Sequence, residues 1–116
     1  MPNSIIIKKK IKKFNKVISV TGDKSISIRW VLFSSLGQGV SRAKNLLISE
    51  DVLAAIKAVK KLGIKVKLQK KNECKIFGKG INGYVYKKNL TIDAQNSGTL
   101  GRLILGLLVD KKNKIS

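Results

Sequence analysis

Eight residues near the N-terminus combine chemistry-bearing side chains at short spacing. Residues 22–29 read GDKSISIR, with the apolar stretch VISV before them and WVLFSSLG after them. If Lys24 opens a helix, its ammonium group, the Ser25 hydroxyl and the Arg29 guanidinium one turn later can hold a phosphate or a carboxylate. The spacing is not that of a Walker phosphate loop. On spacing alone, a capped helix with solvated charges is the simpler interpretation.

A second motif, DAQNSGTLGR at residues 93–102, has the same construction of strand, polar turn and apolar helix. Asn96 offers amide donors and an acceptor, and Gly98 lets a ligand approach the backbone closely. Arg102 follows one turn later, as Arg29 does in the first motif. Helix capping by Asn or Ser would explain either motif by itself. Two such motifs in one chain indicate a site for ligands rich in negative charge and hydroxyl groups.

Apolar periodicity predicts the elements that must position these two motifs. The expected strands are residues 4–7, 17–20, 40–48, 64–69, 73–78 and 89–94, and the expected helices are residues 24–36, 50–62 and 97–109. Ser49 is a good N-cap for the middle helix, and Gly63 is placed just after its end. The order β-α-β-α-β-β, followed by a strand and a helix, is typical of a mixed α/β layer fold.

Composition limits the possible chemistry. The chain has 116 residues, enough for one small domain with a modest core. It has no histidine and one cysteine, Cys74, so we expect no histidine base, no metal cluster and no internal disulfide. Apolar runs are too short for a membrane helix, and the N-terminus lacks the residue order of a signal peptide. We therefore expect a cytoplasmic protein with no membrane partner.

The net charge of +19 leaves a nucleic-acid-binding module open as an alternative. Lysines occur in every expected element, the three arginines are scattered, and the aromatic residues form no stacking pattern. This distribution favours lysine as a solvated surface residue, and we expect no nucleic-acid partner. A positive field would still attract small phosphorylated anions.

The end of the sequence, DKKNKIS, has no feature of a domain end, and the last expected helix is apolar around much of its circumference. Such a helix needs cover that this chain barely supplies. We therefore expect a piece of a longer protein. A small standalone anion-binding domain remains the third alternative.

Three stretches of the sequence resemble the N-terminal part of 5-enolpyruvylshikimate-3-phosphate (EPSP) synthase, the shikimate-pathway enzyme that glyphosate inhibits. They are GDKSISIR, LLISEDVLAAIKAVKKLGIKV and NSGTLGRLILGLL, and the resemblance runs in order from about Val17 to Val109. UDP-N-acetylglucosamine enolpyruvyl transferase shares the family fold but has a different lysine motif, so it is the second choice.

The resemblance implies a fold of two similar domains built from repeated β-α-β-α-β-β units, in an inside-out α/β barrel. Residues 1–116 would be the N-terminal part of such an enzyme, with the C-terminal remainder absent. Residues 1–20 would reach the other domain and residues 21–116 would form part of one domain. The implied reaction transfers the enolpyruvyl group of phosphoenolpyruvate to the 5-hydroxyl of shikimate 3-phosphate and releases phosphate. It needs no metal or organic cofactor, and the full-length enzyme would be a monomer.

By the same resemblance, Lys24 would be catalytic and would contact both substrates. Ser25 and Arg29 would bind shikimate 3-phosphate. Asn96 and Gly98 would border the phosphoenolpyruvate pocket, with Gly98 where a side chain would crowd glyphosate.

Other positions have lesser or altered implied roles. Arg102 is expected to be structural, and Asp51 to be a charge at a helix N-terminus rather than a catalytic group. Ile28 stands where the family usually has His or Asn, and Leu103 stands where some members have Pro. The family's acid/base carboxylate and lysine lie in regions beyond Ser116, so this chain would hold half a site and have no turnover by itself.

Overall fold

A computed structural model describes residues 3–10, 12–111 and 115–116. Its helices and strands are α1 (Lys24–Leu36), β1 (Gln38–Ala43), α2 (Glu50–Lys61), β2 (Lys65–Leu68), the short 3-10 turn η1 (Lys70–Asn72), β3 (Cys74–Lys79) and α3 (Gly98–Leu108). The predicted α/β class and all three predicted helices are confirmed.

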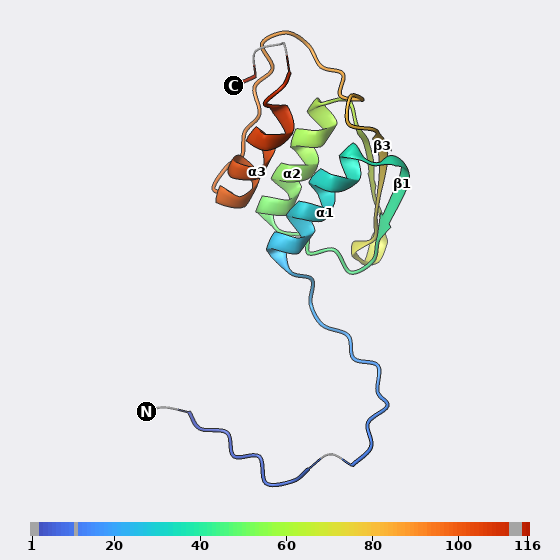
Figure 1. Ribbon diagram of the computed structural model, residues 1–116, viewed down its shortest axis with the longest axis vertical. Helices are drawn as coiled ribbons and strands as arrows, with labels where there is room; N and C mark the ends of the chain where they lie inside the picture. The colour runs from blue at the N-terminus through green and yellow to red at the C-terminus, as the bar shows by residue number, and fades with distance from the viewer. Residues whose placement is uncertain (1–2, 11, 112–114) are drawn as a thin grey trace.

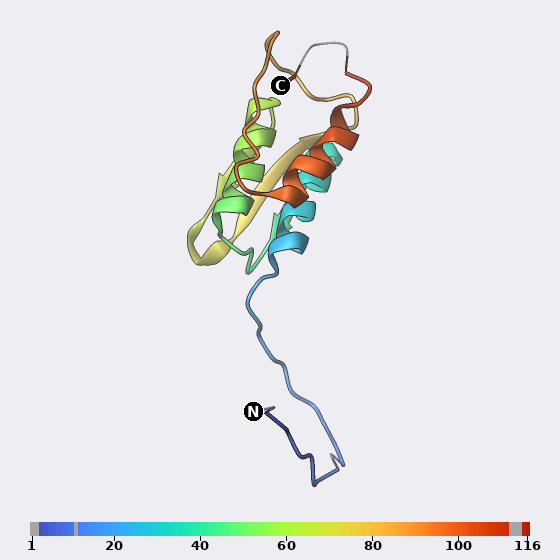
Figure 2. The same cartoon turned by 90° about the vertical axis from the view of Figure 1, so that its left-hand side faces the viewer.

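The three strands form one antiparallel sheet in the order β1-β3-β2. Helices α1 and α2 pack on one face of the sheet, and α3 packs on them from the side away from the sheet (Figures 1 and 2). The core lies between these layers and includes the fully buried side chains of Ile28, Val31, Leu62, Ile76 and Leu100. This arrangement fixes where each helix begins, and therefore where the two polar motifs lie.

The outer face of the sheet is solvent-exposed and basic. Register places Arg42 opposite Lys75 and Lys75 opposite Lys67, so three cations form a row across the strands. The Nζ atoms of Lys65 and Lys67 lie 5.3 Å and 5.9 Å from the centroid of the Phe77 ring. The contacts with this ring are of cation–π type and keep the lysines on the outer face.

Three predicted strands are wrong. Residues 4–7 and 17–20 belong to an extended arm that leaves the domain without pairing (Figure 1). Residues 89–94 form a coil in which Leu90 makes one isolated parallel bridge with Ile115. An apolar stretch becomes a strand only when a partner supplies the hydrogen bonds of the ladder. In the described residues, the sheet contains no partner for these three segments.

The predicted strand at residues 40–48 is displaced, because β1 begins at Gln38 and ends at Ala43. The backbone of Asn45 has φ of 57°, in the left-handed region, so the strand gives way to a turn just after Ala43. The turn leads to Ser49, whose side chain caps α2 as predicted. Gly63 ends that helix with φ of 85°, and a Cβ atom there would lie 2.6 Å from the Val85 carbonyl oxygen.

The long coil between β3 and α3 is anchored to the helices rather than to the sheet. The buried Tyr84 hydroxyl lies 2.6 Å from the Ser35 hydroxyl, and the Val85 N–H donates to the Leu62 carbonyl oxygen at 2.9 Å. Burial raises the pKa of Tyr84, and the hydrogen bond with Ser35 opposes that shift only in part. Further along, Lys61 Nζ donates to the Thr91 carbonyl oxygen at 2.8 Å. These contacts determine where the chain enters α3.

None of the helices in the residues that the structure describes has both the length and the apolar character needed to cross a lipid bilayer.

Candidate functional site

The three helices run in the same direction, so their N-terminal ends lie at the same end of the helical layer (Figures 1 and 2). Lys24 is the first residue of α1 and Gly98 is the first residue of α3. The two polar motifs therefore lie at the same end of the helical layer, where the N-terminal arm joins the domain (Figure 1), although they are about seventy residues apart in the sequence. Aligned helix N-termini also concentrate positive potential there, which favours anionic ligands.

The first motif is braced by the loop that precedes α2. The buried Ser27 hydroxyl accepts a hydrogen bond from the Leu47 N–H at 3.2 Å, and the Asn45 side-chain amide donates to the Val20 carbonyl oxygen. A Cβ atom on Gly22 would lie 2.5 Å from the Asn45 carbonyl oxygen and 2.7 Å from the Leu47 nitrogen. Gly22 is therefore required by this close backbone contact.

Lys24 makes an ion pair that the sequence did not indicate. Its Nζ atom lies 3.2 Å from Oδ2 of Asp51, in the first turn of α2. The Lys24 side chain is 54% exposed and the Asp51 side chain only 20%. Ser25 is half-buried and Arg29 is exposed. The structure thus places the predicted cationic groups at the surface of the first motif, where a ligand can reach them.

Backbone N–H groups at the start of α1 are only partly available to a ligand. Asp23 is the N-cap of α1, and its Oδ1 atom accepts from the Ile26 N–H at 2.7 Å. One of the free donors at the start of the helix is therefore already occupied by a carboxylate of the protein itself. An anion at this corner must rely mainly on Lys24, Ser25 and Arg29.

The second motif is capped locally but has open space around its glycine. The Ser97 hydroxyl accepts from the Leu100 N–H at 3.1 Å, and Asp93 Oδ1 accepts from the Gln95 N–H at 2.7 Å. Ser97 is thus the N-cap, and the exposed side chain of Asn96 has no hydrogen-bond partner among the described residues. A Cβ atom on Gly98 would meet only the Arg102 guanidinium, at 4.0 Å. Packing does not require glycine at this position.

Arg102 has no ion pair within the part of the chain that the structure describes, and its side chain is exposed. Its guanidinium lies close to Gly98 instead of bracing another element. No described contact gives Arg102 the structural role that the sequence suggests, so that role stays a prediction.

Ile28 is fully buried in the core, at 0% exposure. Since its side chain lies in the core, this departure from the motif leaves the exposed groups of the first motif in place. Leu103 is half-buried and packs against the same core. Both Ile28 and Leu103 thus pack their apolar side chains into or against the core.

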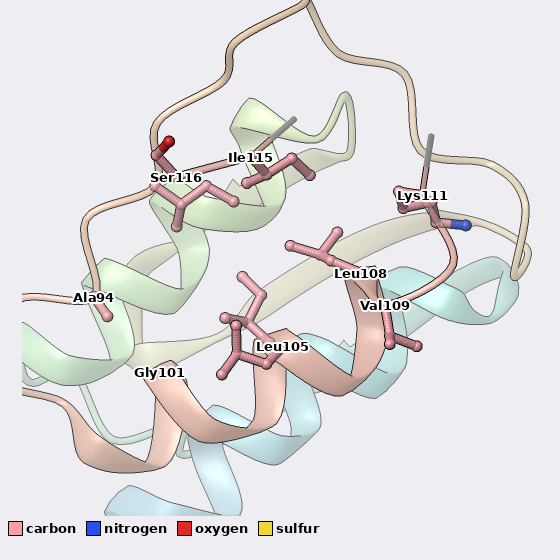
Figure 3. A pocket seen from close by; sticks show the side chains of 10 residues that line it. Ala94, Gly101, Leu105, Leu108, Val109, Lys111, Ile115 and Ser116 are labelled. Carbon is pink, nitrogen blue, oxygen red and sulfur yellow. The ribbon is translucent and has the colours of Figure 1, made fainter. Parts of the chain in front are cut away.

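An apolar pocket of about 500 Å³ lies elsewhere, between α3 and the C-terminal residues (Figure 3). Leu105, Leu108 and Ile115 point into it. None of the five predicted site residues lines this pocket, and its apolar lining suits neither a phosphate nor a carboxylate. The pocket is separate from the predicted anion site. The exposed Leu105, at 70%, agrees with the prediction that the last helix is apolar beyond what this chain covers.

Comparison with known proteins gives a consistent result. Residues 8–116 match the family EPSP synthase (3-phosphoshikimate 1-carboxyvinyltransferase). The chain is 41% identical over 99 residues to the 3-phosphoshikimate 1-carboxyvinyltransferase of Bacillus cytotoxicus, covering 85% of this chain and 23% of that protein. It is 42% identical over 107 residues to the enzyme of the same name from Thermoanaerobacter sp. strain X514, covering 91% of this chain and 25% of that one.

The solved EPSP synthase of Acinetobacter baumannii superimposes with a TM-score of 0.74 at 31% identity, over 85% of this chain and 23% of that one. The chain therefore spans about a quarter of the length of the curated relatives that it matches. The family fold of repeated β-α-β-α-β-β units is confirmed, with the leading strand of the unit unformed among the described residues. By sequence and by fold, this chain belongs to the EPSP synthase family.

Proposed function

We propose that this chain supplies one side of the active site of an enolpyruvyl transferase. The reaction moves the enolpyruvyl group of phosphoenolpyruvate to the 5-hydroxyl of shikimate 3-phosphate and releases inorganic phosphate. The observation that carries the proposal is that both polar motifs lie at the N-terminal end of one helical layer, where both substrates could place their negative charge.

Each predicted residue has a role that its position supports. Lys24 contacts both substrates and offsets the charge that develops on phosphoenolpyruvate, because its ammonium is accessible and stands at a helix start. Ser25 and Arg29, on the same helix face, bind shikimate 3-phosphate. Asn96 and Gly98 border the phosphoenolpyruvate pocket, since the amide is exposed and the space above the glycine is open.

The proposal includes the arrangement of the chain. Residues 21–116 form part of one domain, and residues 1–20 reach a second domain, for which their exposed apolar side chains are suited. Ile5, Ile7 and Val20 are exposed, as expected of a segment that buries its apolar side chains against another unit. The complete enzyme would be a cytoplasmic monomer without a nucleic-acid partner.

Substrate binding by the 116-residue chain tests the proposal directly. Titration with shikimate 3-phosphate, followed by amide chemical shifts, should perturb residues 24–29 and 96–102 in the wild type and much less in Lys24→Met. Because the chain lacks the groups expected beyond Ser116, it should show no steady phosphate release with both substrates. Binding of an oligonucleotide with a steep salt dependence, together with no response to shikimate 3-phosphate, would instead favour the nucleic-acid alternative.

A further inference from the structure

The ion pair between Lys24 and Asp51 joins the first turns of two helices. Lys24 opens α1, and Asp51 is the second residue of α2. The two helix starts are held together by the Ser27–Leu47 and Asn45–Val20 hydrogen bonds. The backbone that carries both partners is therefore held in place, although the Lys24 side chain itself is 54% exposed.

The electric field at the helix N-termini has opposite effects on Asp51 and Lys24. A carboxylate near helix N-termini is stabilised by the positive end of the helix dipole, so Asp51 is favoured at the start of α2. An ammonium group at the same place is disfavoured by the same field, and Lys24 is the first residue of its own helix. The nearby Asp23 is engaged with the Ile26 N–H, which leaves Asp51 as the carboxylate paired with Lys24.

We propose that Asp51 is the positioning residue of Lys24, holding its ammonium at the mouth of the site before an anionic substrate arrives. Without this carboxylate, the helix field and the net charge of +19 would drive the long lysine side chain outward into solvent. Asp51 thereby lowers the ordering cost when the substrate binds, because one flexible side chain is already in place. It acts through Lys24 and is not itself a catalytic residue.

The sign of one mutational effect separates this role from a simple charge effect. If Asp51 only repelled anionic substrates, Asp51→Asn would tighten their binding. If Asp51 positions Lys24, the same change weakens binding, by about two- to fivefold for a pair of this exposure. Glu50→Gln is the matched control, since Glu50 lies in the same helical turn, is exposed and has no ion pair among the described residues.

The experiment has two arms on the 116-residue chain. The first measures the side-chain order of Lys24 by ¹³Cε relaxation without ligand, with the signal assigned by its loss in Lys24→Met. We expect Lys24 to be more ordered than the exposed lysines, to lose this order in Asp51→Asn, to keep it in Glu50→Gln and to regain most of it in Asp51→Glu. A Lys24 as mobile in the wild type as in Asp51→Asn would overturn the proposal.

The second arm measures the dissociation constant of phosphoenolpyruvate in the presence of shikimate 3-phosphate. Asp51→Asn should weaken binding, Glu50→Gln should leave it unchanged or tighter, and Asp51→Asn should add nothing once Lys24 is methionine. Tighter binding in Asp51→Asn would overturn the positioning role.

Only this second arm rests on the proposed function. If the wild-type chain did not bind phosphoenolpyruvate, that result would count against the proposed function. The relaxation measurement would still decide whether Asp51 restricts the motion of the Lys24 side chain.

Discussion

The two polar motifs, residues 22–29 and residues 93–102, both lie at the start of a helix, but they differ in the contacts that stabilise them. At the start of α1, Gly22, Ser27 and the Lys24–Asp51 pair tie the motif to the loop and first turn of α2. At the start of α3, the motif has a serine cap and an aspartate-stabilised turn, and Gly98 lies beside open space. The first corner is thus built into the tertiary structure, whereas the second is defined mainly by its own few residues.

This contrast separates residues that serve the fold from residues that remain free for a ligand. In the first corner a glycine is needed to let two backbones meet, and in the second a glycine leaves room that the protein does not fill. Alanine in place of Gly22 should therefore lower stability, whereas alanine in place of Gly98 should mainly affect ligand binding.

The largest expected effect is on activity, at Lys24. In a chimera where this chain replaces the matching quarter of the Bacillus cytotoxicus relative, Lys24→Met should lower kcat by about a hundredfold or more if Lys24 has the proposed role, because the variant would lose the cation that offsets the developing charge. Steady-state phosphate release with both substrates measures this. Lys44→Met, a change at an exposed lysine of the neighbouring loop, is the control and should retain activity. Equal losses in both variants would remove the special role of Lys24.

Gly22→Ala should cost about 1–3 kcal/mol of unfolding free energy, since the added methyl group overlaps the Asn45 and Leu47 backbone. Urea denaturation of the 116-residue chain, followed by circular dichroism, measures the change. Gly106→Ala is the matched control, because a Cβ atom there meets nothing within 4 Å. If both variants unfolded at the wild-type urea concentration, the first corner would not be braced as described.

Ser27→Ala should destabilise the chain by about 1 kcal/mol, because the Leu47 N–H loses its hydrogen-bond acceptor in a part-buried place. The same urea experiment applies. Ser34→Ala serves for comparison, since Ser34 is a buried serine of the same helix without a described side-chain hydrogen bond. A loss no greater for Ser27→Ala than for Ser34→Ala would show that the α1–α2 loop contact adds nothing.

Gly98→Ala should have the smallest effect on stability, a gain of about 0.5 kcal/mol or less from better helix propensity. Its effect on phosphoenolpyruvate binding should be a clear loss, because the methyl group enters the space that the ligand would use. Isothermal titration together with urea denaturation separates the two quantities. A destabilised Gly98→Ala variant would mean that the glycine serves packing after all.

Local patterns were sufficient to predict the helices. The capping residues Ser49 and Ser97 and the apolar periodicity of α2 and α3 mark the limits of these two helices within a residue or two, and the structure confirms them. The predicted limits of α1, Lys24 and Leu36, are also those of the structure. The corners follow from these limits, because each motif is the start of a helix. The placement of Lys24 and Gly98 at the same end of the helical layer depends on the parallel course of α1 and α3 (Figures 1 and 2), which the long coil between β3 and α3 makes possible and which local patterns do not predict.

Local patterns could not predict contacts that depend on distant partners. Residues 17–20 have the apolar character of a strand, yet strand formation depends on a neighbour that a local pattern cannot name. The Lys24–Asp51 pair joins residues 27 positions apart, as its numbering shows, and arises only when α1 and α2 lie side by side. Among the residues that join α1 to the loop before α2, Asn45 has a type that favours a turn, because asparagine tolerates the left-handed conformation that it adopts here.

The short, lysine-bearing strand at the margin of the sheet affects how the chain behaves in solution. β2 is an outer strand of four residues with Lys65 and Lys67 on its exposed face. An exposed edge strand can pair with the edge strand of another copy of the chain and so promote aggregation, whereas short edge strands that carry lysines disfavour such pairing. The opposition is partly electrostatic, so it weakens as salt screens the charge. Colloidal stability should therefore be greatest at low ionic strength, and added salt should promote precipitation rather than prevent it.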